Sequence, residues 1–188
     1  MRPVRLTLAG LCVSILAAGA GPAARAQSSP ASDGLRLGPL SIMTQAPTLV
    51  DLGTGVYDLI GNAHRNETGA VDAELRLGQR WAGIGPAMGT IVDLKGGGMV
   101  YVGLDSDLAL GPVVVTPLIG LGAWWQGGGN DENLGGTFEF RLSLAASYVF
   151  DNGSRLGIRF GHISNADLHQ RNPGENDLMV TYGMPLKL

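Results

Sequence analysis

A histidine and a serine two residues apart are the side chains of this sequence best suited to chemistry. His162 and Ser164 follow an alternating apolar row, Leu156, Ile158 and Phe160. Because side chains on a β-strand alternate between its two faces, His162 and Ser164 are predicted to lie close together on the face of this apolar row. Such a pair can supply a nucleophile and its general base. The alternative is that the strand ends near Phe160 and both residues lie in a solvated loop.

Eight segments have the alternation or the composition of β-strands. They cover residues 48–59, 71–78, 87–95, 100–105, 112–125, 138–150, 153–164 and 178–188. After residue 26, no window of 18 apolar residues predicts a helix that spans a membrane. The number and length of these segments match strands that cross a bilayer at a tilt.

The two faces of these strands differ in composition. One face is apolar, and the other carries Gly, Ser, Ala and paired charges such as Glu139 with Arg141. In a barrel the apolar rows face lipid, whereas in a sandwich they face each other. We therefore predict an all-β fold, an eight-stranded antiparallel transmembrane β-barrel, with a soluble β-sandwich as the alternative. Pro117 argues against its own segment being a strand, and the three tryptophans, Trp81, Trp124 and Trp125, fit an interfacial aromatic girdle.

The connections predict which end of the barrel carries the candidate site. Outer-membrane barrels have short periplasmic turns and longer external loops. The long connections are 60–69, 126–136 and 165–176, and the short ones include 109–111 and 151–153, with Gly96–Gly98 as a short exception. With both termini on the periplasmic side, His162 and Ser164 lie at the external end.

The N-terminus and the composition restrict the class of protein. Arg2 and Arg5 precede an apolar run at 6–20 and small residues at Ala24 and Ala26, which predicts a secretory signal over 1–26 and a barrel domain over 27–188. The 13 basic and 16 acidic side chains leave no basic excess for nucleic acid. A single Cys excludes an internal disulfide.

A longer motif surrounds the histidine and serine. His162-Ile163-Ser164-Asn165-Ala166, followed by 172–174 (Asn-Pro-Gly) and a last strand, resembles the lipid A 3-O-deacylase family, PagL. The resemblance implies an enzyme of the bacterial outer membrane whose Ser-His-acid site hydrolyses the ester-linked acyl chain at position 3 of lipid A. The implied partners are the membrane and lipopolysaccharide of its outer leaflet, with no metal or cofactor, and a homodimer is left open.

The resemblance also implies a role for each site residue. His162 is the general base and Ser164 the nucleophile. Asn172 matches a residue that stabilises the oxyanion, and Asn165 a supporting neighbour. Glu175 is the expected acid of the site.

Two positions depart from the family pattern. The best-known member places its acid one position after Glu175, where this chain has Asn176, and Asp167 stands where Gly is usual. We expect a one-residue adjustment of the loop to bring Glu175 to the imidazole. Two other functions stay open: a structural or adhesion barrel with an incidental His-Ser pair, and a phospholipase, whose calcium requirement no acidic cluster here suggests.

Overall fold

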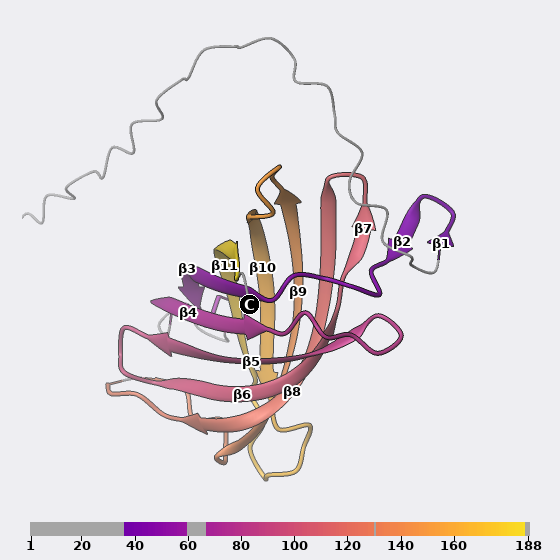
Figure 1. Ribbon diagram of the computed structural model, residues 1–188. Coiled ribbons are helices and arrows are strands. Elements are labelled where there is room, and N and C mark those ends of the chain that lie inside the picture. The colour runs from indigo at the N-terminus through magenta and orange to yellow at the C-terminus, as the bar shows by residue number, and fades with distance from the viewer. Residues whose placement is uncertain (1–35, 60–66, 130, 187–188) are drawn as a thin grey trace, which may run out of the picture.

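The computed structural model describes residues 36–59, 67–129 and 131–186, and eight long antiparallel strands make up most of it (Figure 1). These are β3 (Leu49–Tyr57), β4 (Thr68–Arg76), β5 (Ile84–Asp93), β6 (Gly98–Ser106), β8 (Val113–Trp125), β9 (Phe138–Val149), β10 (Arg155–Ser164) and β11 (Glu175–Pro185). They correspond one by one to the eight predicted segments. The predicted signal at 1–26 lies outside the described residues, so the boundary at residue 27 stays a prediction.

The eight strands close into a barrel. Around the ring the order is β8-β6-β5-β4-β3-β11-β10-β9, and β9 pairs with β8 to complete it. The pairing of β11 with β3 joins the last strand of the chain to the first strand of the ring. A closed ring leaves no long unpaired edge, which is the condition for a sheet to cross a bilayer. The predicted eight-stranded antiparallel barrel is confirmed.

Three short strands extend the sheet beyond the ring. β7 (Leu108–Leu110) pairs with the start of β8, β2 (Leu40–Ile42) pairs with β7, and β1 (Arg36–Leu37) pairs with β2 (Figure 1). The predicted turn at 109–111 is therefore partly strand. Runs of two or three residues are too short to show a period-two pattern, so periodicity could not predict them.

Pro117 lies inside β8 at a position that tolerates it. β8 pairs with β7 through Val113–Val115 and with β6 from Leu118 onward, so residues 116–117 fall between the two pairings. On that side, no ladder hydrogen bond depends on the N–H that proline lacks.

The outer wall of the barrel is apolar. Side chains from different strands around the ring, Val71, Val102, Ile119, Leu144, Ile158 and Val180, are each more than half exposed. The side chains between them point inward, and these include fully buried charges such as Arg141 and Asp177. A soluble sandwich would bury its apolar rows and expose its charges, so the observed faces exclude it. Within the described ranges, no helix has the length and hydropathy for a membrane span.

Ion pairs fill the lumen, but their partners differ from the expected ones. Arg141 binds Asp177 of β11 through two contacts of 2.8 and 3.1 Å, rather than Glu139 of its own strand. The pair passes over Gly161 of β10, where a Cβ would collide with the Asp177 carboxylate. The predicted Glu139–Arg141 pair is therefore wrong: the two side chains share a face, but the cross-strand carboxylate takes the guanidinium.

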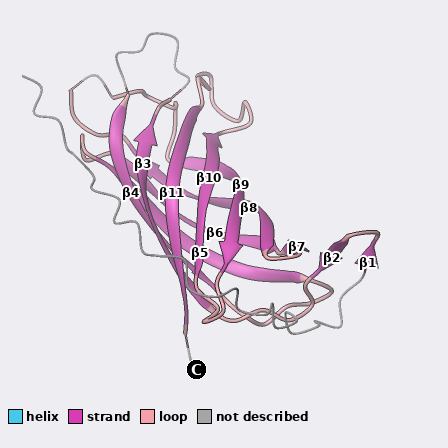
Figure 2. Ribbon diagram, turned by 90° about the horizontal axis from the view of Figure 1, so that it is seen from above, coloured by secondary structure: helices cyan, strands magenta, loops and turns pink. Residues whose placement is uncertain are grey.

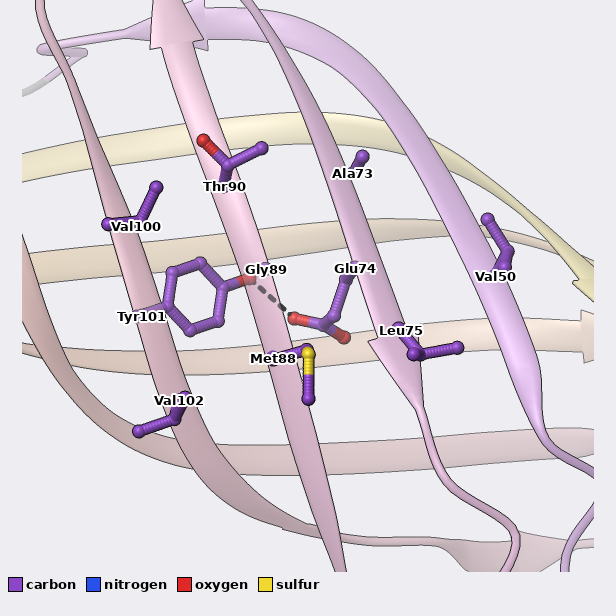
Figure 3. Close-up of a pocket in the computed structure, with 10 residues that line it drawn as sticks. All are labelled: Val50, Ala73, Glu74, Leu75, Met88, Gly89, Thr90, Val100, Tyr101 and Val102. Carbon is purple, nitrogen blue, oxygen red and sulfur yellow. Dashed lines mark hydrogen bonds between the residues drawn. The ribbon is translucent and has the colours of Figure 1, made fainter.

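Similar links tie other strands together. Tyr101 of β6 donates a 2.7 Å hydrogen bond to Glu74 of β4 across Gly89 of β5 (Figure 3). Glu74 also lies 3.0 Å from Arg159 of β10, on the far side of the lumen. Nearer the end of the barrel that carries residues 150–154, Arg76 and Arg155 both contact Asp107, and the contact from Arg155 is 2.9 Å long.

The loops separate the two ends of the barrel as predicted. The described parts of the β8–β9 connection, 126–129 and 131–137, lie at one end with 165–174, and 77–83 and 150–154 lie at the other (Figure 2). The predicted loop at 60–69 falls mostly outside the described residues. One expectation is wrong: Trp124 points into the lumen with 5% exposure, while Trp125 and Trp81 are on the outside.

The Arg141–Asp177 pair gives a test of the lumen. Asp177→Asn should lower the free energy of unfolding by about 3 kcal/mol, because it leaves a buried guanidinium without its carboxylate. Arg171→Gln removes a partner of Glu132 in an ion pair whose arginine is 60% exposed, and it should cost under about 1 kcal/mol. Urea unfolding in detergent micelles, followed by the heat-modifiable shift on gels, measures both. Equal losses of stability in the two variants would contradict a buried Arg141–Asp177 ion pair.

Candidate active site

His162 and Ser164 occupy the loop end of β10, on the outer wall. Gly161 and Ile163 beside them point into the lumen, and Ile163 has no exposed surface. Across the ladder to β9, His162 faces Leu142 and Ser164 faces Phe140. The predicted common face is confirmed, and β10 continues to Ser164 rather than ending at Phe160.

Asn176 of β11 holds the imidazole. It stands directly opposite His162 in the ladder, and His162 Nδ1 lies 2.9 Å from Asn176 Oδ1. An amide oxygen can only accept, so Nδ1 carries the proton and donates it. Nε2 is then left with a free lone pair, which is the state that a general base requires.

Glu175 does not reach His162, which corrects its expected position. In the ladder Glu175 faces Ile163, so its side chain points into the lumen and is 1% exposed. Neither carboxylate oxygen is hydrogen-bonded to His162, and the polar side chain that interacts with Glu175 is Tyr57 of β3. A shift of one residue to bring Glu175 outward would reverse every side chain of β11, placing Asp177 against lipid.

The loop after Ser164 fixes the amide of Asn172. Asn172 Oδ1 accepts a 3.1 Å hydrogen bond from the main-chain N–H of Asn165, and Asn172 Nδ2 donates a 3.0 Å bond to Asp167 Oδ1. Asp167 has φ +62°, a conformation that favours Gly but that Asp adopts more readily than most residues. The unusual Asp therefore fits the backbone and also orients Asn172.

Asn165 joins two external loops. Its side chain is fully buried, and its Nδ2 donates to the carbonyls of Leu134 at 2.6 Å and Arg171 at 2.8 Å. Leu134 belongs to the loop between β8 and β9, and Arg171 to the loop between β10 and β11. Asn165 thus supports the loop architecture around Ser164 and does not present its side chain to a substrate.

Gly174 is a site residue to which the sequence pattern assigned no role. Its φ is +69°, and a Cβ there would lie 2.8 Å from His162 Cε1. The backbone at Gly174 therefore packs against the imidazole ring. The Asn-Pro-Gly triplet at 172–174 was the signal that could have indicated it, because a glycine at a fixed distance from a histidine suggests a close approach of the backbone.

Apolar side chains surround the pair on the outer wall. Leu142, Leu144, Phe160 and Leu178 are each exposed by 41–54%. Phe140, opposite Ser164, makes an edge-to-face contact with Phe138 at a centroid distance of 5.3 Å. The Ser-His pair therefore lies at the border between an apolar strip, formed by β9, β10 and β11, and the loop of residues 165–174.

Other features of the described part of the chain do not form a second reaction site. No group of three or more His, Cys, Asp or Glu among these residues is arranged to hold a metal. A shallow groove on the outer wall of β3–β6 is lined by Val50, Leu75, Met88 and Val100 (Figure 3). β5 lies four strands from β10 in either direction around the ring, so this groove is on the opposite wall from His162.

Fold and site together define a transmembrane β-barrel with a serine and a histidine on one face of its outer wall. Comparison with known proteins agrees with this description: residues 51–185 match the family model described as lipid A 3-O-deacylase (PagL). The chain therefore belongs to the lipid A 3-O-deacylase (PagL) family.

Individual relatives match over shorter stretches. Lipid A deacylase PagL of Pseudomonas aeruginosa is 38% identical over 56 residues, which cover 30% of this chain and 32% of the relative. The protein of the same name from Bordetella bronchiseptica is 31% identical over 52 residues, 28% of this chain and 29% of the relative. The matches thus span about a third of these relatives. The crystal structure of the outer membrane enzyme PagL superposes with a TM-score of 0.57 at 21% identity, covering 73% of this chain and 99% of that one.

The contact between Gly174 and the imidazole can be tested with a matched pair of glycines. Gly174→Ala should displace the ring and lower the rate of ester hydrolysis about a hundredfold, as a shift of about 1 Å in a catalytic group can do. Gly96→Ala is the control, because Gly96 has φ +85° and a Cβ added there would meet nothing within 4 Å. Both variants carry the same kind of backbone strain, about 1–2 kcal/mol. The release of fatty acid from lipopolysaccharide measures the rate, and equal rates for the two variants would contradict the contact.

Proposed function

We propose that this protein is an outer-membrane esterase that hydrolyses the ester-linked acyl chain at position 3 of lipid A. One observation carries the proposal: Ser164 and a histidine with a free Nε2 share the lipid-facing wall at the loop end of the barrel. Polar groups on such a wall are costly, and a reaction with a membrane lipid accounts for them. Membership of the lipid A 3-O-deacylase family supports the same substrate.

The substrate is proposed to lie along the outer wall. The outer leaflet carries lipopolysaccharide, whose acyl esters lie between the sugar headgroup and the hydrocarbon. Ser164 stands at the corresponding boundary, between the loop of residues 165–174 and the apolar strip. The acyl chain then runs down beside Leu142 and Phe160, and the sugars face the loops. A homodimer stays a separate prediction.

The chemistry follows from the roles of the two side chains. Ser164 Oγ attacks the ester carbonyl carbon while His162 Nε2 takes the hydroxyl proton. The resulting oxyanion collapses, the bond to the 3-oxygen of the sugar breaks, and His162 returns the proton to that oxygen. Water then attacks the acyl-serine, His162 again takes and returns a proton, and the free fatty acid leaves.

Asn172 is the proposed donor to the oxyanion. It has two Nδ2–H groups, and one of them donates to Asp167, which leaves the second for the developing charge. The main-chain N–H of Asp167 is a further candidate, since replacing Gly by Asp changes the side chain but keeps the amide. The hydrogen bond from Asn172 occupies one oxygen of the Asp167 carboxylate and thereby reduces its repulsion of an oxyanion.

Alanine at the nucleophile is the decisive test. Ser164→Ala and His162→Gln should each reduce the release of 3-hydroxy fatty acid at least about a thousandfold, while the barrel keeps its heat-modifiable shift. Ser143→Ala on the lumen side of β9 and His169→Gln in the loop are the controls, and both should retain activity. Mass spectrometry of lipid A from cells that express each variant gives the measurement.

The alternatives give different results in the same experiment. Release of the 3-position chain by a folded Ser164→Ala variant would remove Ser164 as the nucleophile. Unchanged lipid A in cells with the wild-type protein would favour the structural or adhesion barrel. Fatty acid lost from phospholipids alone would indicate the phospholipase.

A further inference from the structure

We infer that Asn176 is the positioning residue for His162, so that the site operates as Ser-His-Asn with no acid facing the imidazole among the described residues of the neighbouring strands. The inference rests on the proposed function for its effect on rate, although the hydrogen bond itself can be tested without any reaction. It assigns to Asn176 the place that the expected acid would have held.

The ladder places the side chain of Asn176 directly opposite His162. β10 and β11 pair with His162 opposite Asn176, and the 2.9 Å bond to Nδ1 runs between neighbouring strands within the wall. The backbone of Gly174 lies against the adjoining edge of the ring, which carries Cε1 and Nε2. The imidazole is therefore held at Nδ1 and along one edge, and Nε2 is left for Ser164.

No carboxylate shares this face with the imidazole among the described residues of the neighbouring strands. From β9 the neighbour of His162 is Leu142, and from β11 the neighbours are Asn176 and Leu178. Asp167 of the following loop is bonded to Asn172. The nearest strand charges, Arg141, Glu175 and Asp177, are all buried on the lumen side of the wall.

An amide and a carboxylate do different work at this position. Either oxygen accepts the Nδ1 proton and fixes the same tautomer, but only a carboxylate adds a full negative charge that favours the imidazolium. The imidazolium of this site is therefore stabilised by the dipole of a neutral amide. The pH–rate profile therefore reports on position 176, because replacing an asparagine with a purely structural role would leave that profile unchanged.

Variants at position 176 separate the two roles in the full-length protein in detergent micelles with lipopolysaccharide. Asn176→Leu should lower kcat about tenfold to a hundredfold with little change in KM, because the tautomer is no longer fixed. Asn176→Asp should retain or raise kcat and move the acidic limb of the pH–rate profile upward by about one pH unit. The control, Glu175→Gln, faces the lumen and should keep the wild-type profile. Wild-type kcat in Asn176→Leu together with an unmoved limb in Asn176→Asp would overturn the inference.

A spectroscopic test is independent of turnover. In wild-type protein labelled with 15N-histidine, the neutral ring of His162 should carry its proton on Nδ1, and in Asn176→Leu it should become a mixture of tautomers. The chain has 3 histidines, so the His162→Gln spectrum identifies the signal. A proton on Nε2 in the wild type would overturn the inference even if Asn176→Leu fails to fold. If Ser164→Ala still releases the acyl chain while the Nδ1 tautomer is observed, the proposed function fails and the role of Asn176 in holding the ring stands.

Discussion

The need to pair every backbone N–H and C=O at membrane depth determines the rest of this structure. A sheet can meet it only by closing on itself, as the pairings β9–β8 and β11–β3 do here. Closure fixes the register of each strand, and register fixes which side chains face lipid. His162 and Ser164 are outside and Glu175 is inside for this reason, whatever chemistry each could perform.

The lumen charges make that register hard to change. A slip of one residue in β10 or β11 would carry Arg159 or Asp177 to the lipid side, and an arginine at the centre of the bilayer costs about 2–4 kcal/mol. The Arg141–Asp177 pair lies directly behind the site, over Gly161, and links β9 to β11 through the strand between them. The polar interior thus holds rigid the wall on which Ser164 and His162 stand, and rigid placement is what a catalytic pair requires.

Period-two alternation was enough to predict the strands and the faces, because it reports the direction of each side chain within its own strand. It carries no information on which residue of the next strand lies opposite. That is why the pairing of Glu139 with Arg141 was wrong. Glu175 was chosen for a different reason, as the carboxylate next to the family's acid position, although the parity of Leu178 and Val180 in β11 turns it inward. The loop of residues 165–174 sets the register between β10 and β11. The conformation of this loop depends on contacts made by Asn165, Asn172 and Gly174. Trp124 was misplaced because composition alone suggested a girdle, whereas its parity in β8 turns it inward.

The position opposite His162 is subject to two opposing demands. A carboxylate would stabilise the imidazolium formed during attack, but it would stand on the outer wall beside Leu178, where the unpaired charge of the resting state is poorly solvated. A neutral amide avoids that desolvation cost and still fixes the tautomer, at the expense of electrostatic stabilisation of the cation. In the proposed mechanism, Asn176 supplies no charge next to the base, so stabilisation of the transition state depends more on the oxyanion side, where Asn172 is held by Asp167 and by the backbone of Asn165. The departure at 167 and the departure at 176 are then complementary, since one orders the donor to the oxyanion while the other gives up charge next to the base.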